Sequence, residues 1–124
     1  MRYMPKSSKP IIGMCGFGSI ENIDLDLYLR PDDYSEVVCG GTDTIDTLAE
    51  RWAKKNHLEF IVFLPQYEIY GSYAMLKRNE DIANYVDKLV CFWDGKNKDL
   101  KDIIDYCLKI SRVQEIHLVE DLDI

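Results

Sequence analysis

Residues 36–56 read EVVCGGTDTIDTLAERWAKKN, and this stretch decides the fold class. Its first four residues are β-prone and end at the pair Gly40-Gly41, after which a helical pattern begins at once. The second part repeats apolar residues at the spacing of an amphipathic helix, namely Ile45, Leu48, Ala49 and Trp52. A strand that ends in glycines and leads into a helix places backbone N–H groups beside the positive helix end, which suits a phosphorylated small molecule. The alternative is a plain strand-to-helix turn, in which glycine supplies a positive φ.

The same alternation of strand-like and helix-like runs extends along the chain. Apolar runs bounded by Gly, Pro or Asp predict strands at 11–15, 36–39, 59–64, 88–92 and 115–119. Helical patterns occupy 42–56, 73–85 and 100–108, and a short helix is expected within 21–30, where Pro31 truncates it. We therefore expect an α/β fold, a Rossmann-like three-layer sandwich with a mainly parallel sheet of about five strands.

Length and composition predict a single domain over 1–124, with an N-terminal extension at 1–9 and an acidic tail at 120–124. The chain has 124 residues, 47% of them hydrophobic and 30% charged, which is typical of globular proteins. No apolar run approaches the roughly 20 residues that cross a bilayer, and we expect no signal peptide, because the apolar run after residues 1–10 is too short for its hydrophobic region. We expect a cytoplasmic protein without a membrane partner. The net charge of −7 argues against a nucleic-acid partner, because phosphate backbones bind clustered Lys and Arg.

The four cysteines predict neither a metal site nor a cofactor. Cys15, Cys39 and Cys91 lie near strand ends, and Cys107 falls on the apolar stripe of a helix. No pair of ligands has zinc-finger spacing, so we expect small buried hydrophobic side chains. The competing hypothesis is that the three strand-end cysteines converge on a metal or reactive-thiol site.

Ligands of such folds bind at the carboxyl ends of the strands, near the point where strand order reverses. The first of these loops contains Gly16, Gly18 and Ser19, but Glu21 stands where a dinucleotide fingerprint has its third glycine. A nicotinamide dehydrogenase is therefore not expected, and a Walker lysine motif is absent. Neither histidine falls on a strand-end loop, so a Ser-His-Asp or Cys-His nucleophile lacks its base.

The helix after Gly41 opens with Asp43 and Asp46, which suit helix capping or sugar hydroxyls better than a phosphate. Asn79 falls on the apolar stripe of its helix, where an unpaired amide is costly and needs a partner. Its neighbour Arg78 is expected at the rim, where it would pair with a phosphate or an acidic residue, a structural clamp being the alternative.

The fourth predicted strand is followed by a second candidate ligand loop. It contains Asp94 and Gly95, with Asn97 or Asp99 as the expected N-cap of the next helix. Capping alone is the alternative explanation of this loop.

Taken in order, several short motifs resemble the YspA, or cpYpsA-related, branch of the SLOG superfamily. They are GGTDTID at 40–46, AERWA at 49–53, FLP at 63–65, KRNE at 77–80, Asp87 and FWDGK at 92–96. The resemblance covers roughly residues 11–119 and implies a Rossmannoid fold related to the LOG phosphoribohydrolases and DprA, and a homodimer. It implies that Gly40, Gly41, Asp43 and Asp46 line a ligand pocket with Arg78, Asn79 and Asp94. The family's Ser-x-Gly-Thr phosphate loop is replaced here by the run 97–100, NKDL, in which Asp99 disfavours a phosphate.

These observations lead to three functional hypotheses. The preferred one is the binding of a nucleotide or nucleotide-derived small molecule at the strand-end cleft. The second is an N-glycosidic hydrolase of nucleoside monophosphates, in which Asp94, Asp43 or Asp46 stabilises the sugar or activates water and Arg78 holds the phosphate. The third is a protein-interaction module without a ligand.

Overall fold

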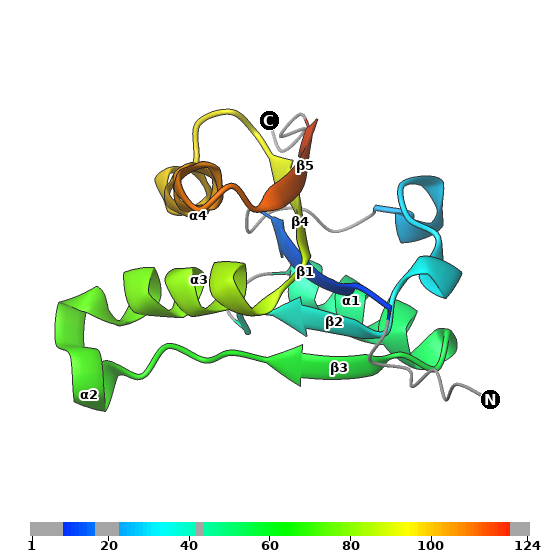
Figure 1. Cartoon of the computed structure of the whole chain (residues 1–124), viewed down its shortest axis with the longest axis horizontal. Coiled ribbons are helices and arrows are strands. Elements are labelled where there is room, and N and C mark those ends of the chain that lie inside the picture. The colour runs from blue at the N-terminus through cyan, green and yellow to red at the C-terminus, as the bar shows by residue number, and fades with distance from the viewer. Residues whose placement is uncertain (1–8, 17–22, 42–43, 120–124) are drawn as a thin grey trace.

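A computed structural model of the chain describes residues 9–16, 23–41 and 44–119 (Figure 1). Five parallel strands form one sheet in the order β3-β2-β1-β4-β5. The strands are β1 (Ile11–Gly16), β2 (Glu36–Cys39), β3 (Glu59–Val62), β4 (Lys88–Trp93) and β5 (Val113–Leu118). The strand order reverses at β1, because β2 and β3 follow on one side of it and β4 and β5 on the other. The predicted Rossmann-like α/β sandwich with a five-stranded parallel sheet is confirmed.

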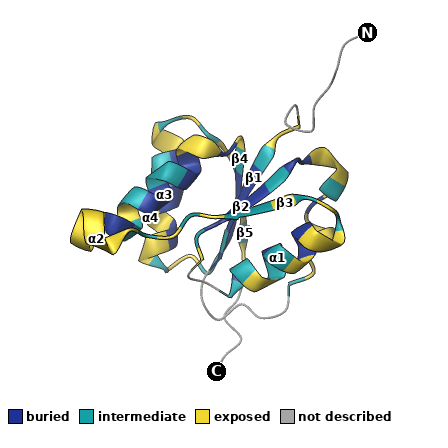
Figure 2. Cartoon of the chain, turned by 90° about the horizontal axis from the view of Figure 1, so that it is seen from below, coloured by how far each residue is buried: buried dark blue, intermediate teal, exposed yellow. Residues whose placement is uncertain are grey.

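Helices cover both faces of this sheet. The long helices are α1 (Ile45–Lys55), α3 (Ala74–Tyr85) and α4 (Lys98–Lys109). Helix α1 lies on one face, and α3 and α4 lie side by side on the other (Figure 2). The chain leaves the sheet after β3 and projects to the short helix α2 (Tyr67–Tyr70) and a 3₁₀ turn, Gly71–Tyr73, before α3 (Figure 1). No helix in the described part of the chain has the length and apolarity to cross a membrane.

The strand predictions differ from the structure mainly at the two edge strands. Strand β3 ends at Val62 and not at 64, and the amide of Phe63 makes the last bond to β2, on the carbonyl oxygen of Cys39 at 2.8 Å. Beyond Cys39 the chain turns away at Gly40, so β3 has no partner to follow. Strand β5 begins at Val113, two residues before the prediction, because a left-handed residue, Ser111 (φ 57°), closes the turn after α4.

The short helix expected within 21–30 is present as a single 3₁₀ turn, Leu25–Leu27, within the described residues 23–30. Asp24 caps this turn, since its carboxylate accepts from the amide of Asp26 at 3.1 Å. A second 3₁₀ turn, Pro31–Asp33, follows immediately. Pro31 starts a new turn and cannot continue the first, because its ring excludes the preceding residue from helical geometry.

The core consists of two apolar layers, one on each face of the sheet. Helix α1 buries Ile45, Ala49, Trp52 and Ala53 on one side, and α3 and α4 bury Ile82, Ala83, Ile103 and Cys107 on the other. These residues recur at helical spacing, so the predicted stripes are the buried faces. Each large apolar side chain buried in this way contributes about 1.5–3 kcal/mol.

Close packing of α3 on β1 requires a residue without a side chain at position 13. A Cβ atom on Gly13 would lie 3.1 Å from Cγ1 of Val86 and 3.3 Å from Cγ2 of Ile82. Both neighbours are buried, so neither has free space to move into. Gly13 thus sets the distance of α3 from the sheet.

We expect Gly13→Val to lower the free energy of unfolding by about 1–3 kcal/mol, the usual cost of overpacking a core. Urea unfolding monitored by circular dichroism measures this difference. The matched control is Glu59→Val, which introduces the same side chain at an exposed position of β3, and we expect a change within about 0.5 kcal/mol. Equal stability of the two variants would contradict the packing argument.

Candidate functional site

A cleft opens at the carboxyl end of β1, where the strand order reverses. Residues 14–16 of β1 and Gly40 form its floor, and Asp46 of α1 lies at its edge. One wall comes from α3 through Met75, Arg78, Asn79 and Ile82. The opposite wall comes from the start of α4 through Asn97, Asp99, Leu100 and Ile103. The position agrees with the rule that open α/β sheets hold ligands at their switch point.

The cleft is narrow. Its free volume is about 50 Å³, which is room for a few water molecules. A larger molecule therefore reaches into the cleft with one edge or displaces a wall.

Arg78 connects α3 to the turn after β2. The residue is 7% exposed, and Nη1 donates a hydrogen bond to the carbonyl oxygen of Gly40. Nε donates to Oδ1 of Asn79 at 2.9 Å, and Nη2 lies 3.5 Å from the sulfur of Met75. The sequence predicted Arg78 at the rim, and this is corrected: the side chain is buried, because backbone and amide oxygens satisfy its donors.

The two glycines after β2 serve different purposes. A Cβ atom on Gly40 would lie 2.5 Å from Nη1 and 2.8 Å from Cζ of Arg78, so Gly40 makes room for the guanidinium. Gly41 has a φ of +77°, and a Cβ there would lie 2.5 Å from Cδ2 of Leu64. Gly41 is thus the residue that turns the chain, and Gly40 is the residue that lines the cleft.

Asn79 presents a hydrogen-bond donor without a partner to the cleft. The residue is 8% exposed, and its Oδ1 accepts from Nε of Arg78. An arginine nitrogen only donates, so the oxygen of the amide must face it and Nδ2 must point away. Nδ2 has no hydrogen-bond acceptor among the residues that the structure describes. Nδ2 of Asn79 is not among the fully buried atoms that lack a partner, a set that holds only Oε1 of Gln114 in the described part of the chain, so water or a ligand in the cleft can accept its hydrogen bond.

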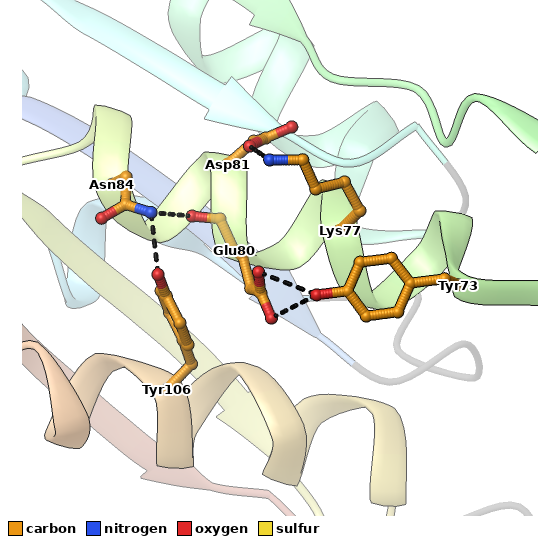
Figure 3. Close-up of polar contacts among 6 residues, drawn as sticks. All are labelled: Tyr73, Lys77, Glu80, Asp81, Asn84 and Tyr106. Carbon is orange, nitrogen blue, oxygen red and sulfur yellow. Dashed lines mark hydrogen bonds and ion pairs between the residues drawn. The ribbon is translucent and has the colours of Figure 1, made fainter. Parts of the chain in front are cut away.

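The outer face of α3 shows how the same side chain behaves when it is satisfied. Nδ2 of Asn84 donates to the carbonyl oxygen of Glu80 at 3.0 Å and lies 2.9 Å from the hydroxyl of Tyr106 on α4 (Figure 3). Asn84 is exposed, whereas Asn79 is buried. The unsatisfied amide of α3 is therefore the one that faces the cleft.

Asp94 and Gly95 shape the turn before α4 and do not line the cleft. The carboxylate of Asp94 accepts from the amides of Asn97 and Lys96, both at 2.8 Å, and these bonds lower its pKa. Gly95 has a φ of +82°. Asn97 then caps α4 by accepting from the amide of Leu100 at 3.0 Å, as expected. This turn places Asn97 and Asp99 at the wall of the cleft.

The predicted site residues fall into three groups. Five of them line the cleft together: Gly16, Gly40, Asp46, Arg78 and Asn79. Three are absent from its lining: Gly41, Asp94 and Gly95. Three others, Gly18, Ser19 and Asp43, lie outside the described residues.

Sequence reasoning missed Met14, Cys15 and Ile103 as lining residues. The position of Cys15 at the end of β1 could have predicted its place in the lining, because the last residues of this strand border the switch point. The three strand-end cysteines do not form a metal cluster, since no group of three potential ligands occurs among the described residues. Cys39, Cys91 and Cys107 are buried and Cys15 is half-buried, so the first three follow the prediction of buried cysteines.

No protein family model matches this chain, and no curated protein matches it. The fold and the cleft define a Rossmann-like α/β domain with a cleft of mixed polar and apolar lining at its switch point.

We expect iodoacetamide to alkylate one cysteine of the native protein, Cys15. Cys15 borders the open cleft, whereas Cys107 is buried and burial raises its thiol pKa to about 11. Intact-mass spectrometry gives the number of added groups, and peptide mapping gives their positions. Cys15→Ser should remove the rapid reaction, and rapid labelling of Cys39, Cys91 or Cys107 would contradict the described burial.

We expect Asp94→Asn to destabilise the protein by less than about 1 kcal/mol at neutral pH, because Asp94 is only half-buried and solvent screens its charge. The folded-state pKa of Asp94 is lowered, so its contribution exists above the unfolded-state pKa and is lost as the pH falls through the folded-state pKa. Urea unfolding between neutral and strongly acidic pH should show the two proteins converging. The matched control is Asp102→Asn on the exposed side of α4, with a change within about 0.5 kcal/mol.

Proposed function

We propose that this protein binds a nucleotide or nucleotide-derived small molecule in the cleft between α3 and α4. The observation that carries the proposal is the amide of Asn79: the residue is 8% exposed, its Oδ1 accepts from Arg78, and its Nδ2 has no acceptor among the described residues. A fixed donor that borders the cleft without a protein partner is available to an acceptor on a ligand. A ligand that carries a hydrogen-bond acceptor would satisfy it.

Two further observations support a nucleotide-like ligand. The cleft lies at the switch point of a parallel sheet, where nucleotides bind in many folds of this class. The residues that resemble the SLOG motifs include Gly40, Asp46, Arg78 and Asn79, and these four line the cleft together.

A hydrolase of nucleoside monophosphates is the second candidate. The observation that favours it is the presence of two carboxylates, Asp46 and Asp99, in the lining of one cleft. Carboxylates in such a position stabilise positive charge on a sugar or activate a water molecule. We rank this candidate second, because the described lining holds no histidine to assist either step.

Thermal-shift measurements with nucleoside monophosphates, NAD and ADP-ribose test the proposal on wild type and Asn79→Asp. This variant keeps the oxygen that accepts from Arg78 and replaces the Nδ2 donor by an acceptor, so it should fold and lose ligand binding. We expect at least one compound to raise the melting temperature of wild type and not that of the variant.

The matched control is Asn84→Asp, the same exchange on the outer face of α3 (Figure 3). It should respond to the compound as wild type does, since the hydroxyl of Tyr106 can donate to the new carboxylate. Chromatography of each mixture detects free base, which would establish the hydrolase. An unchanged melting temperature with all compounds would reject both candidates in favour of an interaction module.

A further inference from the structure

We propose, resting on the function above, that the cleft recognises the uncharged sugar and base of its ligand and discriminates against phosphate. The ligand class is then a nucleoside, or a nucleotide derivative whose phosphate stays outside the cleft. Three independent features of the lining lead to this inference.

The first feature is that the cationic side chain in the cleft already contacts the protein. Arg78 is the one cationic side chain among the described residues of the lining. Each of its three guanidinium nitrogens already contacts the protein, at Gly40, Asn79 and Met75. A phosphate normally binds arginine through two parallel donors, and here three contacts fix the orientation of the guanidinium while the residue is only 7% exposed, which limits the access of an anion to it.

The second feature is the negative charge around the cleft. Asp46 and Asp99 both line it, each in the first turn of a long helix. Carboxylates at these positions complement the positive helix ends that would otherwise attract an anion. Asn97 also occupies one of the free amides of α4, that of Leu100. A phosphate would meet two like charges in place of two helix dipoles.

The third feature is the chemistry of the other polar groups in the lining. Nδ2 of Asn79 donates to neutral acceptors such as a base carbonyl, a ring nitrogen or a hydroxyl oxygen. The carboxylates accept from ribose hydroxyls or from exocyclic amines. A volume of about 50 Å³ admits one edge of such a molecule. The amide donor, the carboxylate acceptors and the small volume of the cleft therefore match the polar edge of a nucleoside.

Calorimetric titration of the full chain with matched pairs tests this inference. The probes are adenosine, guanosine, cytidine and uridine, their 5′-monophosphates, and inorganic phosphate. We expect one nucleoside to bind at least about tenfold more tightly than its monophosphate and to slow the alkylation of Cys15. Inorganic phosphate should neither bind nor protect Cys15.

Two variants assign the discrimination to the residues named. Asp99→Asn removes one carboxylate and should shift the ratio of the two dissociation constants towards the monophosphate by several-fold. The matched control, Asp102→Asn, changes an exposed carboxylate of the same helix and should leave the ratio unchanged. Asn79→Asp should abolish nucleoside binding and melt no lower than wild type, because its oxygen still meets Arg78.

The outcomes separate this inference from the function on which it rests. A monophosphate that binds as tightly as its nucleoside, or an unchanged ratio in Asp99→Asn, overturns the discrimination and leaves ligand binding in place. A failure of every probe, together with no response to NAD or ADP-ribose, overturns the proposed function itself.

Discussion

The hydrogen bond from Arg78 to the carbonyl oxygen of Gly40 is the contact on which the cleft depends. It joins α3 to the turn after β2, two elements that lie 38 residues apart in sequence. Gly40 must lack a side chain for this bond to form, and Asn79 is oriented by the same guanidinium. The contact thus determines the floor of the cleft, one of its walls and the direction of its main donor.

This arrangement explains how an arginine can be buried beside a candidate ligand site. Burying a guanidinium is costly unless oxygens satisfy its donors, and backbone and amide oxygens do so here. The positive charge of Arg78 consequently faces oxygen atoms of the protein itself. The carboxylates of Asp46 and Asp99 then dominate the electrostatics that a ligand meets, which suits hydroxyl and amine groups.

Hydrophobic periodicity was sufficient to predict the layers, because helices and strands that bury one face must repeat at 3.6 or 2 residues. It placed Asn79 correctly on the inner face of α3. It could not reveal the partner of Arg78, since a backbone carbonyl 38 residues away leaves no trace in residue type. The same limit applies to Asp94: an aspartate before a glycine suits a ligand loop and a turn equally, and hydrogen bonds to two amides show that it shapes the turn.

The asparagine at position 79 also has a consequence for attempts to stabilise this protein. An aspartate at this position would also accept from Nε of Arg78, so this contact alone does not require an asparagine. Residue choices that the fold does not require are expected where a site serves another purpose. Redesign of this domain for a higher melting temperature should therefore keep Asn79, since a replacement without Nδ2 would remove the hydrogen-bond donor that we propose for the ligand.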